Sequence, residues 1–404
     1  MRLDEHGYTP AVFQKIVEAG ARLHSFLDAA FALQLAGVSI SPRHIQNLIR
    51  EIGAELAQQR DAAAARRRRR TLPPQVAQTP DVVAVEVDGG HLRTRLPGQH
   101  GVHAPKNKEN KIACLITLQS VVTAHDPQPE PPPSFLRRVR RLVQQMAGRS
   151  SDTPHDQEEP AEAVDPEEPV AAGEVTAERW APRRLVRTCV ASMVNSRKFG
   201  PLVAAAAQAR DFYRAARRAF VADGQAYNWT IHKGYFPDFE AIADLLHVLC
   251  YLYVAAWAVA EEEATRWAQY VAWLRACWQG RVAEVIAELR RWQERLGEAP
   301  AGAELAADDP RQVVRQTLVY LENNQTRMDY PRYRRAGLPI TSSLAESLVG
   351  EINTRVKGRQ KFWDRPEGAE AILQVRAALL SHNGELTRYF AQRPGCPFRR
   401  RPTS

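Results

Sequence analysis

Three aspartates, Asp88, Asp223 and Asp244, each follow a short run of residues with the composition of a buried strand. Carboxylate oxygens are hard ligands that suit Mg²⁺ or Mn²⁺, and several carboxylates held together repel one another unless cations neutralise them. Two such ions about 4 Å apart can activate a water or hydroxyl and stabilise the leaving oxygen of a phosphate in an in-line displacement. An Asp after a strand is by itself a weak sign, because most such residues only begin a turn. The pattern leaves open which of the three binds metal.

The expected strands and helices bring aspartates together. In chain order they run strand, strand, strand, helix, strand, helix, strand, which is the order of an α/β fold with an RNase H-like mixed sheet. In that arrangement an Asp on the central first strand and an Asp at the end of the fourth lie side by side, and an acidic residue from a later helix completes the cluster. The expected helices between strands cover about 200–217 and the surroundings of Trp229. The five expected strands are residues 81–90, 91–95, 111–123, 219–222 and 240–243.

The N-terminal region, residues 10–57, is expected to be helical. Ser41 is a good N-cap and Pro42 suits the first helical position, while Gly37 suits the left-handed C-cap of the preceding helix. A helix, a short glycine turn and an N-capped helix form the helix-turn-helix pattern, whose second helix can enter a major groove. A plain helical hairpin is the alternative. The residues expected on the exposed face of the second helix are Arg43, His44, Gln46, Asn47 and Arg50.

Charge is distributed unevenly along the chain. Lys and Arg number 55 against 46 Asp and Glu, for a net charge of +9. Residues 152–178 hold ten Asp and Glu and no Lys or Arg, so the rest of the chain carries +19. That balance favours a polyanionic partner, either nucleic acid or an acidic membrane surface, and the clustering of basic residues favours nucleic acid over a merely solubilising surface. The residues best suited to phosphate contacts are the consecutive arginines Arg66, Arg67, Arg68, Arg69 and Arg70.

Several classes of protein do not fit the sequence. The five cysteines are scattered with no Cys-x-x-Cys pair, which argues against a disulfide framework and a zinc ribbon. Charged residues between Arg2 and His6 interrupt any apolar N-terminal region, so no signal peptide is expected. The most apolar window, residues 243–260, contains Asp244 and His247 and is expected to be a buried helix rather than a membrane span. The protein is therefore expected to be cytoplasmic, with no membrane partner.

The second half of the chain is expected to be mainly helical. Residues 245–297 read as helix almost throughout and hold five of the eight tryptophans, for most of which packing is the expected role. Residues 298–310 form a loop, and helix resumes at residue 311. Ser342 or Ser343 can cap the next helix, which another helix and a basic tail follow.

These patterns divide the chain into segments. The acidic stretch is rich in Pro and cannot bury enough apolar surface to fold, so it is expected to be a disordered linker. The expected segments are a helical DNA-binding domain (1–65), a basic linker (66–80), a first part of the sheet core (81–148), the acidic linker (149–178), a second part of the core (179–256), a helical insertion (257–330), C-terminal core helices (331–390) and a basic tail (391–404).

Five stretches of the chain resemble one family. They are "VVAVEVDGGHLRTR", "KENKIACLITLQS", "VADGQAYNWTIHKGYFP", "AIADLLHVLCYLYVAAW" and "PITSSLAESLVGEINTRVKGRQKFWDRPEGAEAILQVRAALLS". In this order they are similar to bacterial insertion-sequence transposases, and the group that they resemble most is the ISKra group of the Mutator-like DDE class. The last stretch is the most specific, and the N-terminal and acidic regions contribute nothing to the resemblance.

The resemblance implies an RNase H-like nuclease core with a triad of two Asp and one Glu. The matching residues are Asp88, Asp223 and Glu346, which would hold two Mg²⁺ or Mn²⁺ ions. Asp244 and His247 match an Asp-x-x-His element that lies between the second Asp and the Glu, so Asp244 would be a neighbour of the ligands rather than a ligand. Their one-turn spacing places both side chains on one helix face, and a supporting hydrogen bond between them is expected.

The resemblance also implies contacts with DNA outside the triad. The long interval between Asp223 and Glu346 fits relatives with a helical insertion after the fifth strand, in which an aromatic side chain can stack on a displaced base. Trp257 and Trp267 are the candidates in this chain. Three basic residues after the Glu346 helix are expected to touch phosphates next to the metal site, with a solvated surface as the alternative; they are Lys357, Arg359 and Lys361.

The function implied by the resemblance is that of a DNA transposase in the bacterial cytoplasm, associated with the nucleoid and assembled as a homo-oligomer on DNA. It would cleave the ends of its own element with water and then join the 3′-hydroxyls to target DNA, both by phosphoryl transfer at one two-metal site. One alternative is an RNase H-like nuclease without strand transfer. Another is a domesticated DNA-binding protein with an inactive site, against which the intact Asp88, Asp223 and Glu346 argue.

Overall fold

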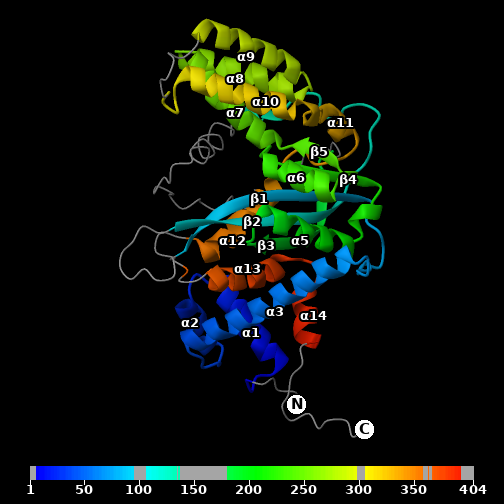
Figure 1. Cartoon of the computed structure of the whole chain (residues 1–404), viewed down its shortest axis with the longest axis vertical. Coiled ribbons are helices and arrows are strands. Elements are labelled where there is room, and N and C mark those ends of the chain that lie inside the picture. The colour runs from blue at the N-terminus through cyan, green and yellow to red at the C-terminus, as the bar shows by residue number, and fades with distance from the viewer. Residues whose placement is uncertain are drawn as a thin grey trace, which may run out of the picture.

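A computed structural model of the chain describes residues 6–94, 106–133, 135–136, 180–297, 305–357, 363 and 366–392. A mixed sheet crosses the middle of the molecule, with one group of helices above it and another below (Figure 1). The α/β class expected from the sequence is therefore confirmed. Arg359, Lys361, the acidic linker and nearly all of the basic tail lie outside the described residues.

The sheet has five strands in the order β3-β2-β1-β4-β5. Strand β2 runs antiparallel to both β3 and β1, whereas β4 runs parallel to β1 and β5 runs parallel to β4. The carboxyl ends of β1, β4 and β5 therefore point the same way. The strands are β1 (Val82–Thr94), β2 (Lys106–Gln119), β3 (Arg183–Ser192), β4 (Arg217–Ala222) and β5 (Glu240–Ala243).

One expected strand is wrong. Residues 91–95 do not pair back on the first strand, because β1 continues to Thr94 and pairs with β2 along its whole length, from Val82 opposite Leu118 to Thr94 opposite Lys106. The Asp-Gly-Gly sequence suggested a turn, but the glycines lie inside the ladder. A Cβ atom on Gly90 would lie only 3.1 Å from Oδ1 of Asn110, so glycine at this position leaves room for the neighbouring strand.

Two further expectations need correction. Strand β3 was not expected, because its exposed first half carries arginines and only its second half is buried. The helix expected over 200–217 is α5 (Ser196–Ala209), and it ends before Asp211, whose left-handed φ of 58° breaks the helix. Strand β4 then begins at Arg217, two residues earlier than expected.

Each face of the sheet is covered by a different set of helices. On one face, Val83, Val85 and Val87 of β1 pack with α5 and α6 (Ala226–Tyr235) in a single apolar cluster. The opposite face of β1 lies against α12 (Ser343–Val356), and α13 (Pro366–Leu380) packs on β3. Because side chains alternate along a strand, Glu86 and Asp88 point to the α12 face.

The N-terminal helices lie below this second face. They are α1 (Pro10–Arg22), α2 (Phe26–Leu35) and α3 (Pro42–Arg68), and the short C-terminal helix α14 (Glu385–Gln392) packs on α1. The expected caps are present, since Ser41 Oγ accepts a hydrogen bond from the His44 N–H at 3.2 Å and Gly37 has a φ of 79°. Helix α3 packs along both α13 and α5, and it extends past the boundary expected at residue 65 to include the first three arginines of the basic run.

The upper group of helices follows β5. Four helices pack in sequence against one another and α11 contacts α8 (Figure 1). None of the helices in the described part of the chain is both long and apolar enough to cross a bilayer. The group comprises α7 (Leu245–Val259), α8 (Glu263–Trp278), α9 (Val282–Leu296), α10 (Pro310–Asn324) and α11 (Tyr330–Arg335).

Candidate metal centre at the carboxyl ends of the parallel strands

The register of the parallel strands places the three aspartates at one level of the sheet. Val87 of β1 lies opposite Ala222 of β4, and Ala222 lies opposite Ala243 of β5. The next residues of the three segments are Asp88, Asp223 and Asp244. The carboxyl edge of β1, β4 and β5 therefore carries three neighbouring aspartates.

Asp244 is fully buried and makes four hydrogen bonds. Its Oδ1 accepts from the backbone N–H groups of Leu246 and Ser342, both at 3.1 Å, and so caps α7. Its Oδ2 accepts from Ser342 Oγ at 2.8 Å and from His247 Nδ1 at 2.6 Å, which confirms the hydrogen bond expected between Asp244 and His247. These donors fill the carboxylate, so Asp244 is built to hold its neighbours in place.

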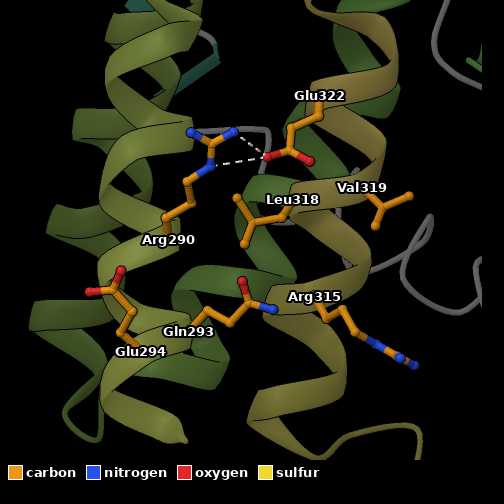
Figure 2. Close-up of a pocket in the computed structure, with 7 residues that line it drawn as sticks. All are labelled: Arg290, Gln293, Glu294, Arg315, Leu318, Val319 and Glu322. Atoms are coloured by element: carbon orange, nitrogen blue, oxygen red, sulfur yellow. Dashed lines mark hydrogen bonds and ion pairs between the residues drawn. The ribbon is translucent and has the colours of Figure 1, made fainter. Parts of the chain in front are cut away.

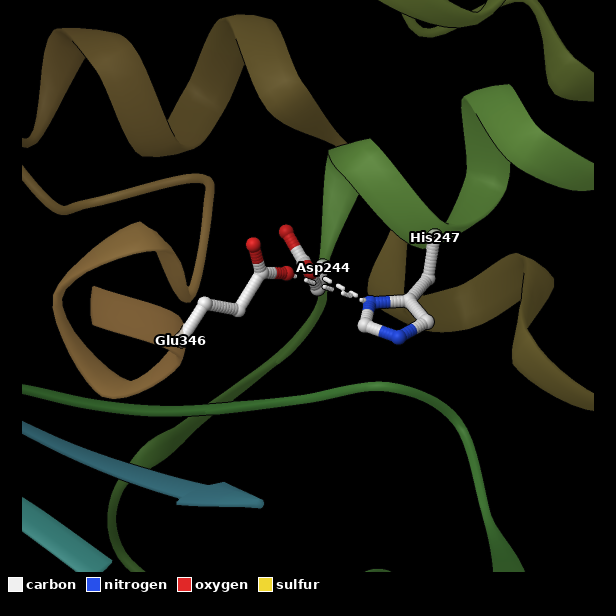
Figure 3. A group of neighbouring side chains, drawn as sticks. All are labelled: Asp244, His247 and Glu346. Atoms are coloured by element: carbon white, nitrogen blue, oxygen red, sulfur yellow. Dashed lines mark hydrogen bonds and ion pairs between the residues drawn. The ribbon is translucent and has the colours of Figure 1, made fainter. Parts of the chain in front are cut away.

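His247 and Glu346 lie beside Asp244 (Figure 3). Nδ1 of His247 is 3.9 Å from Oε1 of Glu346, and one ligand atom from each of the three residues lies within 4.8 Å of the others. Burial lowers the pKa of His247, but the hydrogen bond and charge of Asp244, with the charges of Asp223 and Glu346, raise it to about 10. The carboxylates around the imidazole therefore form a cluster of negative charge of the kind that attracts a cation.

Glu86 is a residue of this site that the sequence did not single out. It lies on β1 two residues before Asp88, is fully buried, and its Oε2 accepts a hydrogen bond from the Ala345 N–H at 2.8 Å. Among the described residues, none donates a hydrogen bond to its Oε1. Burial raises the pKa of Glu86 well above its usual value, the Ala345 N–H opposes this, and the charges of Asp244 and Glu346 raise it further. The only signal in the sequence was a carboxyl at an inward position of an apolar strand.

Asp88 and Asp223 are half-buried at the point where the parallel pairing of β1 with β4 ends. Asp88 Oδ1 accepts from the Gly89 N–H at 2.6 Å, and Asp223 Oδ1 accepts from the Gln225 N–H at 3.0 Å and from Asn228 Nδ2 at 2.8 Å. After burial, the charges of Asp223 and then of Asp88 raise the pKa of Tyr227. Both carboxylates therefore lie close enough to Tyr227 to raise the pKa of its hydroxyl.

The structure brings the predicted triad to one edge without closing it into a tight cluster. Asp88 follows the last residue of β1 that pairs with β4, Asp223 follows β4, and α12 carries Glu346 over β1. Within the described ranges, the group whose ligand atoms lie within 4.8 Å of one another consists of Asp244, His247 and Glu346. Carboxylate oxygens and an imidazole nitrogen are suitable ligands for a divalent ion such as Mn²⁺. The assignment of Asp88 and Asp223 as ligands stays a prediction.

Lys357 lies away from this edge. Glu346 is in the first turn of α12, and Lys357 immediately follows the last turn. They are eleven positions apart, about 16 Å along a helix axis. The expected contact of Lys357 with a phosphate next to the metal site stays a prediction.

The residues expected to contact DNA in the N-terminal region differ in exposure. Arg43, Asn47 and Arg50 are exposed on α3, whereas His44 and Gln46 are half-buried, and Gln46 accepts a hydrogen bond from Arg43. In the basic run, Arg67 is half-buried. It donates to the Tyr213 hydroxyl at 3.1 Å, and its guanidinium carbon lies 5.2 Å from the Tyr213 ring centroid. The exposed members of the run are Arg66, Arg68, Arg69 and Arg70.

The aromatic residues expected as candidates for base stacking pack against one another. Trp257 stacks on Tyr253 with ring centroids 3.9 Å apart, and it meets Trp267 edge-on at 6.5 Å. Both tryptophans are half-buried. Their contacts agree with the packing role expected for most tryptophans of this region.

A separate hollow of about 280 Å³ lies between α9 and α10 (Figure 2). An ion pair between Arg290 and Glu322, 2.7 Å apart, spans it, and no residue of the carboxylate edge lines it. The lining residues are Arg290, Gln293, Glu294, Arg315, Leu318, Val319 and Glu322.

Compared with models of protein families and with curated proteins, the chain matches none of them.

Proposed function

We propose that the protein is a DDE transposase that cleaves the ends of a DNA element and joins the 3′-hydroxyl ends to target DNA. The observation that carries the proposal is the register of β1, β4 and β5, which sets Asp88, Asp223 and Asp244 side by side, with Glu346 brought to the same edge by α12. The strand order β3-β2-β1-β4-β5, with three antiparallel strands followed by two parallel ones, supports an RNase H-like core.

In this proposal Asp88, Asp223 and Glu346 hold two Mg²⁺ or Mn²⁺ ions. When bound, the ions supply activation of the attacking oxygen and stabilisation of the leaving oxygen. Asp244 orients His247 through its 2.6 Å hydrogen bond and fixes the start of α12 through Ser342. The reaction begins with attack by water at the element end, and the freed 3′-hydroxyl then attacks the target strand.

DNA binding is assigned to the N-terminal helices and the exposed arginines. The excess of basic residues gives the chain a net charge of +9, which attracts a polyanion. Exposed Arg43, Asn47 and Arg50 on α3 agree with a helix-turn-helix whose second helix enters a groove. We assign assembly to a homo-oligomer on the DNA ends.

The test uses the full chain with labelled DNA from the two flanks of its own gene. With Mg²⁺ or Mn²⁺ the wild type should nick the flanks at fixed positions and join them to a plasmid, whereas Asp88→Asn, Asp223→Asn and Glu346→Gln should each bind DNA and abolish both steps. Cleavage without joined product would assign a nuclease instead. Binding without cleavage by the wild type would assign a DNA-binding protein with an inactive site.

A further inference from the structure

The first turn of α12 lacks the cap that its own sequence offers. The first N–H groups of a helix have no partner within the helix and need an outside acceptor. Ser342 stands at the N-cap position, but its side chain accepts no hydrogen bond from the helix, and its Oγ donates to Asp244 at 2.8 Å. The hydroxyl that the sequence provides as a cap is therefore used elsewhere.

A residue from the sheet supplies a side-chain acceptor instead. Oε2 of Glu86 on β1 accepts from the Ala345 N–H at 2.8 Å, and the same N–H also donates to the Ser342 carbonyl at 2.9 Å. Ala345 immediately precedes Glu346. Both groups are buried from solvent. A carboxyl group at the N-terminal end of a helix is favoured by the helix dipole. Glu86 thus caps α12 from a strand that lies far from it in the sequence.

Stability of the fold does not require a carboxyl group at this position. Within the part of the chain that the structure describes, Glu86 forms no ion pair, and its Oε1 receives no hydrogen bond. A buried carboxyl with a single partner costs free energy relative to an apolar side chain of the same size. The contribution of the Glu86 carboxyl group must therefore lie in how it positions α12 relative to β1.

We propose that Glu86 is a positioning residue that fixes Glu346 relative to Asp88 by capping α12 from β1. Glu86 and Asp88 lie on the same face of β1, two residues apart, which is about 6.7 Å along the strand. The hydrogen bond to Glu86 holds Ala345, the residue before Glu346, against β1, and Asp88 lies two residues further along the same strand. The role assigned to Glu86 in the reaction rests on the proposed function, whereas the cap itself does not.

Two substitutions separate the cap from the charge. Glu86→Met keeps the length of the side chain and removes the acceptor, and Glu86→Gln keeps a carbonyl oxygen that can accept from Ala345. A matched control is Glu351→Met, which removes a carboxylate from the other half of the same helix, where it pairs with Arg187 at 2.7 Å. All three are made in the full chain and compared with the wild type.

The direct measurement is hydrogen–deuterium exchange of the Ala345 and Glu346 amides. In Glu86→Met the Ala345 amide keeps its bond to the Ser342 carbonyl and loses the one to Glu86. Its exchange should therefore be about tenfold faster, the effect of losing one of its two hydrogen bonds. The unfolding midpoint should stay at or above that of the wild type. Glu86→Gln and Glu351→Met should leave this exchange within about threefold of the wild type. If Glu86→Met does not fold, Glu86→Ala takes its place.

DNA cleavage then tests the role in the reaction. Glu86→Met should cleave about 100-fold more slowly, the effect of a small misplacement of a reacting group, and Glu86→Gln should recover most of the rate. Unchanged exchange in Glu86→Met, or equal loss of cleavage in Met and Gln, would overturn the proposal. A wild type that cleaves no DNA would reject the proposed function, while the exchange comparison would still decide whether Glu86 caps α12.

Discussion

The three aspartates at the carboxyl edge of the sheet differ in the donors that surround them. Asp244 is fully buried and accepts four hydrogen bonds. Asp223 is half-buried and accepts two, both at Oδ1, so that no described residue donates to its Oδ2. A carboxylate filled by fixed donors serves to hold the protein around it, whereas an oxygen without such a donor can bind an ion.

This difference predicts opposite effects of two equivalent substitutions. Asp244→Asn places an amide NH₂ against groups that already donate, so the free energy of unfolding should fall by about 2 to 3 kcal/mol. Asp223→Asn keeps the Oδ1 that accepts from Gln225 and Asn228, so stability should change by less than about 0.5 kcal/mol while cleavage is abolished. Thermal unfolding and a DNA nicking assay measure the two effects. Full activity in Asp223→Asn would contradict the assignment.

At the scale of elements, α10 holds the turn after β4. The Tyr320 hydroxyl donates to the Asp223 carbonyl at 3.1 Å, and Trp229 Nε1 donates to the Gly224 carbonyl at 3.2 Å and to Asn324 Oδ1 at 2.9 Å. Gly224 has a φ of 95°, and a Cβ there would lie 2.5 Å from Cε2 of Tyr320. Helix α10 therefore fixes the backbone that carries a predicted metal ligand.

Tyr320→Phe tests this interaction. Removing the hydroxyl should cost about 1 kcal/mol of stability and should slow cleavage more than it weakens DNA binding, because the change moves Asp223 rather than a residue that touches DNA. Tyr251→Phe is the matched control, since its ring stacks on Tyr320 at 3.9 Å but its hydroxyl makes no hydrogen bond with a described residue. Equal effects of the two substitutions on cleavage would remove the special role of the Tyr320 hydroxyl.

The elements that could be predicted are those specified by neighbouring residues. Apolar runs indicated β5 and the first part of β1, and the one-turn spacing of Asp244 and His247 indicated their hydrogen bond. Strand β3 was missed because it pairs only with β2 and half of it is exposed. Glu86 was missed because its role depends on Ala345, 259 residues away in the chain. Contacts of that range follow from packing, which local sequence does not encode.

At the scale of the whole molecule, the N-terminal helices are part of the main core. Arg355 of α12 donates to the Gly20 carbonyl at 3.0 Å, and Arg376 of α13 donates to the Ala21 carbonyl at 3.1 Å. These carbonyls belong to the last turn of α1, where cationic donors are favoured. The N-terminal helices, to which we assign DNA binding, are therefore hydrogen-bonded through α1 to α12, the helix that carries Glu346.

The basic run should act on DNA through its exposed members. Replacing Arg66, Arg68, Arg69 and Arg70 with Ala should reduce the slope of log K against log salt by about 0.9 for each phosphate that is no longer neutralised, without changing sequence preference. Arg67→Ala should instead lower the unfolding midpoint, because Arg67 packs on Tyr213, and should leave the slope unchanged. Fluorescence anisotropy across a salt series measures the slope, and thermal unfolding measures the midpoint. A slope that survives the four substitutions would place the phosphate-binding residues elsewhere.

Helix α12 joins these two regions, with Glu346 in its first turn and Arg355 in its last. Its fourteen residues form a rod of about 21 Å. Mechanically, both ends of α12 are anchored. The first turn is hydrogen-bonded to the carboxyl groups of Glu86 and Asp244, and the last turn to a carbonyl in the final turn of α1. If a duplex bound to the N-terminal helices displaced α1, the displacement would be transmitted through α12 to Glu346 unless the last turn of α12 unwound.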